Sequence, residues 1–141
     1  VTNSDVVTPM LKFYKVTEHI GILGPRLLNQ DRSIQYYGSL LGRIKYLGRS
    51  PRKVGFISGA AMFLKKDLYL EVGGFDENYF FYNEDLDLCK RLNKKGYHNY
   101  YHPQISLVHI GGGSTGAVKL LRKQAWKSSW YFFKKFYLPL K

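Results

Sequence analysis

The sequence predicts an α/β fold in which a mixed sheet is flanked by helices. Short apolar runs alternate with segments of helical periodicity along the 141 residues, a pattern typical of domains in which helices cover a sheet. Hydrophobic residues make up 45% of the chain, which is enough to build a core and argues against disorder. Both observations indicate a folded, layered domain.

The first third of the chain predicts one helix and one strand. Thr8-Pro9 resembles a helix cap followed by proline in the first turn and predicts a helix over residues 6–19. The apolar residues 20–25 predict a buried strand that stops at a Gly-Pro pair. Residues 36–53 are rich in glycine and basic side chains and predict an irregular loop.

The middle of the chain predicts a strand followed by two helices. Residues 54–64 predict a buried strand, whose small residues would let a ligand or another backbone approach closely. Residues 66–72 predict a short helix that ends at two glycines. Asn83 predicts the cap of a helix of about twelve residues that ends at Gly96.

The remaining elements are two strands and a long helix. Residues 97–101 and 105–109 predict two short strands separated at Pro103, and a glycine-rich loop follows them. Residues 118–137 again show helical periodicity. We therefore expect two units, an α/β portion at 1–117 and a basic amphipathic helix at 118–141.

Charge is distributed unevenly along the chain. Residues 1–87 contain 11 Lys and Arg against 10 Asp and Glu, whereas residues 88–141 contain 11 basic residues and no acidic one. A basic tail of this kind indicates an anionic partner, either phospholipid headgroups, a phosphorylated substrate or nucleic acid. The single cysteine, Cys89, excludes an internal disulfide framework and favours a reducing compartment.

The C-terminal helix has aromatic residues of the kind that concentrate at a bilayer interface, namely Trp126, Trp130, Tyr131 and Tyr137. Its lysines fall on a different face from residues such as Leu121 and Phe136. Two interpretations stay open. The helix lies on an anionic membrane, or it packs its aromatic face on the rest of the domain.

The run Asn83-Glu84-Asp85-Leu86-Asp87 places three carboxylates within four residues at a predicted helix start. A helix N-terminus holds a carboxylate rigidly and keeps it ionised, as a general base requires. Acidic residues also favour the first helical turn for electrostatic reasons alone. Spacing therefore leaves a catalytic and a structural role open.

Two further residues have side chains that suit a metal ion. Asp5 follows Asn3-Ser4 in a predicted turn, where a carboxylate either binds a metal or caps a helix. His109 precedes a glycine run that leaves room for phosphate, and it is either a ligand or a half-buried histidine bonded to a backbone carbonyl.

Taken in order, these motifs closely resemble family 2 glycosyltransferases, above all the bacterial rhamnosyltransferase-like members that build cell-surface polysaccharide. The motifs that carry the resemblance are Ser58-Gly59-Ala60-Ala61-Met62, Val72-Gly73-Gly74-Phe75-Asp76-Glu77, Phe80-Phe81-Tyr82-Asn83-Glu84-Asp85-Leu86-Asp87, Gly96-Tyr97 and His109-Ile110-Gly111-Gly112-Gly113-Ser114. The resemblance implies the nucleotide-sugar-binding GT-A fold, of which this chain would be the C-terminal part, and an inverting reaction.

The resemblance also implies roles for individual residues. Asp85 matches the catalytic base that deprotonates the acceptor hydroxyl, and Glu84 lies beside it. Gly59 and Ala60 match the strand that lines the sugar and acceptor pocket.

The metal-binding and donor-side residues are implied in the same way. Asp5 matches the metal-binding carboxylate of an Asp-x-Asp-type motif, and Asn3 occupies the first position of that motif, on the substrate side. His109 matches a position that completes the metal site in some members. Oxygen and nitrogen donors of this kind suit Mn²⁺ or Mg²⁺.

We therefore expect metal-assisted transfer of a sugar from a nucleotide-diphosphate sugar, such as dTDP-rhamnose, to a saccharide or lipid-linked acceptor. The expected location is the cytoplasm, peripheral on the inner face of an anionic membrane, with no nucleic acid as partner. The family's N-terminal half is absent from the sequence, so we expect this chain alone to be poorly active or inactive. The alternative is a non-catalytic basic module that binds membrane or nucleic acid.

Overall fold

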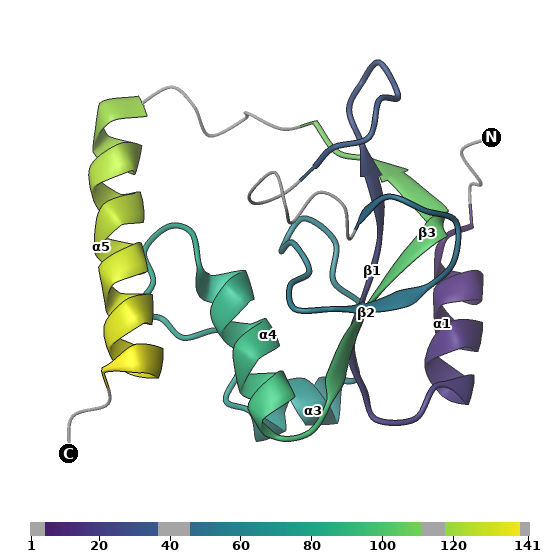
Figure 1. The fold of residues 1–141 in the computed structure, drawn as a ribbon, viewed down its shortest axis with the longest axis horizontal. Coiled ribbons are helices and arrows are strands. Elements are labelled where there is room, and N and C mark those ends of the chain that lie inside the picture. Colours follow the sequence, from purple (N-terminus) through teal and green to yellow (C-terminus); the bar gives the residue numbers. More distant parts are fainter. Residues whose placement is uncertain (1–4, 37–45, 111–117, 139–141) are drawn as a thin grey trace.

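A computed structural model describes residues 5–36, 46–110 and 118–138 of the chain (Figure 1). Its centre is a three-stranded sheet in the order β1-β3-β2, formed by β1 (Ile20–Leu28), β3 (His98–Val108) and β2 (Arg52–Val54). β1 runs parallel to β3, and β2 runs antiparallel to it. The predicted α/β class with a mixed sheet is confirmed.

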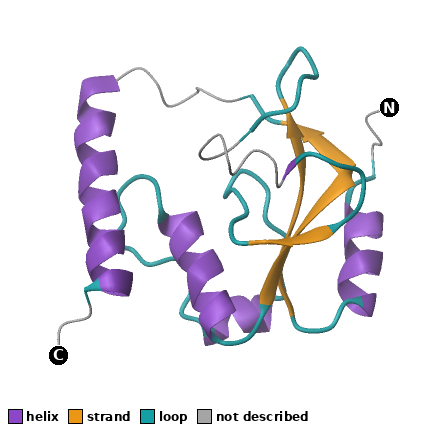
Figure 2. Cartoon of the chain, in the orientation of Figure 1, coloured by secondary structure: helices purple, strands orange, loops and turns teal. Residues whose placement is uncertain are grey.

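Helices cover both faces of this sheet (Figure 2). Successive residues of a strand point to opposite faces, so Ile22 and Leu23 are both fully buried but belong to different clusters. Leu23 packs with α1 (Val7–Val16), whereas Ile22 packs with α4 (Glu84–Lys94). The short helix α3 (Lys66–Glu71) contributes Leu68 to the same cluster as α4.

The direction of α1 sets which residues meet at the edge of the sheet. Three residues separate the end of α1 from the start of β1, so the helix runs back along the strand and its N-terminus lies toward the carboxyl ends of β1 and β3 (Figure 1). In open α/β sheets, ligands bind outside the carboxyl ends of the strands. Asp5 and His109 therefore share this edge.

Two strands extend further than the sequence predicts. β1 continues past Gly24 and Pro25 to Leu28, and β3 is one strand that includes Pro103. The pairing of β1 with β3 shifts between Pro25↔His102 and Arg26↔Ser106. Pro103 therefore falls in an irregularity of the ladder, where the missing N–H of proline costs no hydrogen bond. The predictions of a stop at the Gly-Pro pair and a break at Pro103 are both wrong.

The predicted buried strand over residues 54–64 is also wrong. Only its first residue belongs to a strand, β2, and only the isolated bridge Leu23↔Phe63 joins the rest to the sheet among the described residues. Backbone N–H groups of this segment bond instead to side chains of α4. Ile57 donates to Cys89 Sγ at 3.3 Å, and Gly59 donates to Asp85 at 2.9 Å.

The helix α5 (Val118–Tyr137) lies beside α4, as Figure 1 shows. Side-chain hydrogen bonds join the two, for example Lys90 Nζ to Tyr137 Oη at 2.6 Å. The predicted helix over residues 118–137 is confirmed. Within the described ranges, α5 included, there is no helix with the length and hydrophobicity that crossing a membrane requires.

Candidate functional site

The N-terminus of α4 presents Asp85 to the loop that contains Gly59. Asp85 Oδ2 accepts a hydrogen bond from the Gly59 N–H at 2.9 Å, and Oδ1 accepts one from the Leu86 N–H at 2.8 Å. A carboxylate has about four lone-pair sites, so each oxygen retains one for another partner. The structure thus brings together the two residues that the resemblance assigned to base and substrate pocket.

The backbone that leads into α4 adopts an uncommon conformation. Tyr82 and Asn83 both have positive φ, 66° and 73°, which costs about 1–3 kcal/mol per residue outside glycine. Asn83 occupies the N-cap position of α4, where it was predicted, but its side chain makes no cap hydrogen bond to the helix. Its Nδ2 instead donates to Ser129 Oγ of α5 at 3.1 Å, because the left-handed backbone places the side chain away from the helix start.

Glu84 and Ala60 flank the Asp85–Gly59 contact in sequence. Glu84 is half-buried, and its Oε2 is inaccessible to solvent without a hydrogen-bond partner among the described residues. Buried carboxylate oxygens are rarely left unpaired, and a bound molecule would reach this atom only after the Glu84 side chain turned toward solvent. Ala60 is exposed, and its N–H is 3.3 Å from Ser58 Oγ.

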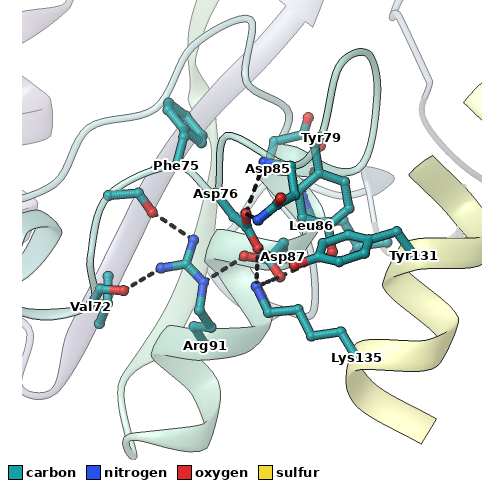
Figure 3. A network of polar contacts seen from close by, with 12 residues as sticks. Val72, Phe75, Asp76, Tyr79, Asp85, Leu86, Asp87, Arg91, Tyr131 and Lys135 are labelled. Carbon is teal, nitrogen blue, oxygen red and sulfur yellow. Dashed lines mark hydrogen bonds and ion pairs between the residues drawn. The ribbon is translucent and has the colours of Figure 1, made fainter. Parts of the chain in front are cut away.

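Asp87, two residues after Asp85, lies in a different environment (Figure 3). Its side chain has no exposed surface, and it accepts hydrogen bonds from Tyr79 Oη at 3.1 Å and from Arg91 Nε at 2.5 Å. Lys135 of α5 forms an ion pair with it at 2.7 Å. Asp87 therefore connects α4 to the preceding loop through Tyr79 and to α5 through Lys135.

A second carboxylate, Asp76, completes this ionic cluster. Its Oδ2 accepts hydrogen bonds from Lys135 Nζ at 2.6 Å and Tyr131 Oη at 3.0 Å. Burial opposes ionisation of Asp76, but the hydrogen bonds from Lys135, Asn78 and Tyr131 outweigh it and hold its pKa well below the usual range. The sequence analysis missed this cluster, since Lys135 lies far from both carboxylates in the sequence.

Arg91 ties the cluster to the turn that follows α3. Its guanidinium donates to the carbonyl oxygens of Val72 and Gly74, the latter at 2.6 Å (Figure 3). Gly74 has a φ of 65°, the left-handed region that favours glycine. Arg91 thus binds both Asp87 and the backbone carbonyls of the turn at the end of α3.

His109 lies just beyond β3, in a pocket of about 540 Å³. The residues that line this pocket are Asn29, Gln30, Asp31, Gln35, His109 and Ile110. His109 Nδ1 is 2.8 Å from Gln35 Oε1, so its partner is a side-chain amide rather than a backbone carbonyl. The sequence analysis did not single out Asp31 or Gln35, and they are separated from His109 by more than seventy positions.

Asp5 helps to begin α1. Its Oδ1 accepts a hydrogen bond from the Thr8 N–H at 3.0 Å, and this bond lowers its pKa. Asp5 is not among the residues that line the His109 pocket, although it precedes α1 and His109 follows β3 at the same edge of the sheet. Asn3 and the loop Gly111–Ser114 lie outside the described residues.

The fit of this edge to a metal ion is incomplete. Across residues 5–36, 46–110 and 118–138, no group of three or more His, Cys, Asp or Glu side chains is placed to hold one. One Asp5 oxygen is already used by the helix, and His109 bonds to an amide. The described residues therefore do not assemble a complete metal site.

Cys89 is fully buried in the α4 cluster, where burial raises the pKa of its thiol to about 12. A thiol with so high a pKa is unreactive at neutral pH. Cys89 is therefore a packing residue of α4.

Known proteins support the resemblance. The chain is 38% identical over 91 residues to the N-acetylglucosaminyl-diphospho-decaprenol L-rhamnosyltransferase of Mycobacterium tuberculosis, which covers 64% of this chain and 30% of the relative. It is 38% identical over 56 residues to rhamnosyltransferase WbbL of Escherichia coli, 40% of this chain and 21% of the relative. The O-antigen biosynthesis protein RfbC of Myxococcus xanthus is 24% identical over 127 residues, 77% of this chain and 10% of the relative.

The chain thus spans less than a third of the length of these relatives. The sequence profile described as "Glycosyl transferase family group 2" matches residues 31–137, which include Gly59, Asp85 and all residues of the His109 pocket except Asn29 and Gln30. The mixed sheet with helices on both faces is consistent with part of the GT-A fold expected for such enzymes. By this match the chain belongs to glycosyl transferase family group 2.

Proposed function

We propose that this chain supplies the acceptor-side part of an inverting glycosyltransferase, with Asp85 as the catalytic base. The observation that carries the proposal is the placement of Asp85. Its carboxylate is fixed by the N–H groups of Gly59 and Leu86 and keeps free lone pairs at the start of α4. A base must be held within reach of the proton that it removes, and this arrangement supports such a role.

In the proposed reaction, an Asp85 oxygen takes the proton of an acceptor hydroxyl. The hydroxyl oxygen attacks the anomeric carbon of the donor, and the bond from that carbon to the nucleoside diphosphate breaks. The electron pair leaves with the diphosphate, and single displacement inverts the anomeric centre. Gly59 and Ala60 line the same subsite, and the Glu84 side chain would turn out of its buried position to accept a hydrogen bond from a second acceptor hydroxyl.

The relatives suggest the substrates. Two of them are named as rhamnosyltransferases, and the name of one specifies an N-acetylglucosaminyl-diphospho-decaprenol acceptor. We propose a nucleotide-diphosphate sugar, with dTDP-rhamnose as the first candidate, and a saccharide or lipid-linked acceptor in cell-surface polysaccharide synthesis. The chain spans 30% of that relative, so we assign the complete activity to a longer protein and expect little from this part alone.

Enzymes of this family generally use a divalent metal, which offsets negative charge on a leaving diphosphate when it is bound. We propose Asp5 and His109 as contributors to an Mn²⁺ or Mg²⁺ site, with Asn3 on the donor side. Asp5 precedes α1 and His109 follows β3, which places both toward the carboxyl edge of the sheet and supports this assignment. Ligands beyond the described residues would have to complete the site.

A lipid-linked acceptor would place the reaction at a membrane surface. We propose a cytoplasmic enzyme that is peripheral on the inner face of the membrane. The basic composition of residues 88–141, which have no acidic residue, supports an anionic surface as the partner.

The test compares two substitutions in the protein as its gene encodes it, with transfer from dTDP-rhamnose to an N-acetylglucosaminyl-diphospho-lipid as the assay. Asp85→Asn removes the base and should lower kcat about 10²–10⁴-fold. Asp67→Asn, at an exposed position of α3, is the matched control and should leave kcat unchanged. Full activity of Asp85→Asn would refute the assignment of the base.

A further inference from the structure

Four aromatic side chains form a continuous stripe on the outward side of α5. Trp126, Trp130, Phe133 and Tyr137 are 69%, 45%, 42% and 58% exposed. Their spacing of four, three and four residues places them on one side of the helix. Neighbouring rings are stacked, with centroids 6.4, 5.8 and 5.6 Å apart. We call these four residues the aromatic stripe.

The opposite side of α5 already has its partners. Ser128 is 3% exposed, and Tyr131 and Lys135 bond to carboxylates of the ionic cluster. A surface helix normally turns its aromatic side inward and its charged side to water. Of the stripe, Tyr137 contacts Lys90 of α4 through its hydroxyl and its ring. Lys135 is directed inward while both tryptophans are exposed, so docking on the domain does not explain the exposure of Trp126, Trp130 and Phe133.

Exposed lysines run alongside the aromatic stripe. Lys127 lies three residues before Trp130 and Lys134 lies four residues after it, so both neighbour that ring on the helix surface. Lys134 Nζ is 5.4 Å from the centre of the Trp130 ring. Lys123 continues the row toward the start of the helix and is also exposed. No acidic residue follows Asp87 in the sequence, so no carboxylate on α5 offsets this charge.

We propose that the aromatic stripe and the lysine row together form a docking surface for an anionic lipid bilayer. Tryptophan and tyrosine rings are stable at the level of the lipid headgroups, and an amphipathic helix with lysines beside them lies in the plane of that interface. The lysines match the charge of anionic headgroups. The inference rests on the proposed function only in that a lipid-linked acceptor requires such a surface.

The docking of α5 on α4 gives this surface a consequence for the site. Lys135 joins α5 to Asp87, and Ser129 joins it to Asn83, the residue that precedes α4. Asp85, the proposed base, therefore lies in the first turn of α4, and α4 is the helix that contacts α5. A bilayer that holds α5 would hold the α4 N-terminus, and with it Asp85, at a fixed height above the headgroups.

The geometry favours lipid over nucleic acid as the occupant. Single-stranded nucleic acid binds aromatic residues by stacking its bases on free ring faces within a basic groove. In the aromatic stripe, the rings stack on one another along a helix at the outside of the molecule, so their faces are partly used. The groups of the aromatic stripe and the lysine row that can contact a partner are mainly ring edges and ammonium groups.

The chain reports on this surface without a label, because Trp126 and Trp130 are its only two tryptophans. The experiment mixes the chain with vesicles of phosphatidylglycerol and phosphatidylcholine, with pure phosphatidylcholine vesicles, or with a single-stranded oligonucleotide. We expect a blue shift of tryptophan emission and protection from acrylamide quenching with the anionic vesicles. The neutral vesicles and the oligonucleotide should produce a much smaller change.

Two pairs of substitutions locate the effect. Lys127→Gln with Lys134→Gln should weaken vesicle binding roughly thirtyfold, since about 1 kcal/mol per lysine corresponds to about fivefold each. Lys12→Gln with Lys15→Gln removes the same charge from exposed positions of α1 and should leave binding nearly unchanged. Trp126→Gln with Phe133→Gln should abolish the blue shift of Trp130.

Several results would overturn the proposal. They are equal weakening by the two lysine pairs, a blue shift with the oligonucleotide instead of vesicles, or a concentration-dependent shift without lipid, which would indicate a second copy of the chain. Binding is measured without a sugar donor, so its failure leaves the Asp85 assay unaffected. An inactive enzyme that still binds vesicles would fail only the proposed function.

Discussion

Asp85 and Asp87 lie two residues apart at the start of one helix, yet the structure gives them opposite surroundings. Asp85 is held by backbone N–H groups and retains free lone pairs, whereas Asp87 is fully buried between Tyr79, Arg91 and Lys135. A carboxylate saturated by buried cations is poorly suited to take a proton from a substrate. If Asp85 is the base, as we propose, two neighbouring acidic residues of one motif serve different purposes, one in catalysis and one in holding the fold together.

The largest effect on stability should come from Asp87→Asn. Removing one partner of a buried ion pair leaves the other charges unpaired and costs about 3–5 kcal/mol. Because Arg91 and Lys135 are 18% and 27% exposed, we expect a value near the lower end of that range. Urea unfolding followed by circular dichroism measures the change.

Asp85→Asn should have much less effect on stability than Asp87→Asn. Its stability should change by about 1 kcal/mol or less, since one neutral hydrogen bond to Gly59 can remain. Activity should respond in the reverse order, with Asp85→Asn the more damaging once both proteins are folded. A larger loss of stability in Asp85→Asn than in Asp87→Asn would show that the two roles are assigned the wrong way round.

Lys135→Met should produce the next largest effect. The substitution keeps the long apolar stem but removes the ammonium that bonds to both Asp76 and Asp87. Hydrogen bonds to charged groups contribute about 1.5–3 kcal/mol, and Arg91 remains to pair with Asp87. The free energy of unfolding should therefore decrease by an amount within that range.

The matched control is Lys127→Met, at an exposed position of the same helix. Surface substitutions usually change stability by about 0.5 kcal/mol or less. If Lys127→Met destabilises the chain as much as Lys135→Met, the loss reflects lysine content of α5 and not the ionic cluster.

The sequence predicted the helices well because their apolar periodicity and glycine ends are local signals. Strands were harder to predict. Residues 54–64 are apolar enough for a strand, but their N–H groups are used by Asp85 and Cys89 from a distant helix. Proline at 103 looked like a break because a shift in strand pairing depends on the partner strand and is invisible in one sequence.

The candidate site was predictable only in part. The resemblance assigned Asp85 and Gly59 to one site. Their spacing in the sequence alone could not predict that they are in contact. The joining of Lys135 to Asp76 and Asp87 depends on where α5 docks, and no local pattern specifies this. The assignment of Asp5 and His109 to a metal stays a prediction.

Stability should also depend on pH through Asp76. Its carboxyl pKa is depressed in the folded state from a value of about 3.9 in the unfolded chain. A depressed pKa contributes stability that is present above the unfolded value and lost as pH falls through the folded one. Asp76→Asn lacks this contribution, so the difference in unfolding free energy from the unsubstituted chain should narrow between about pH 5 and about pH 2.

Urea midpoints of both proteins across that interval measure the narrowing. Asp67→Asn, which replaces an exposed carboxylate of α3, should maintain a constant small difference over the same pH values. A constant difference for Asp76→Asn as well would mean that Lys135 does not favour the charged carboxylate. In that case the cluster would hold α5 by packing alone, and the contrast between a saturated Asp87 and an available Asp85 would lose its electrostatic basis.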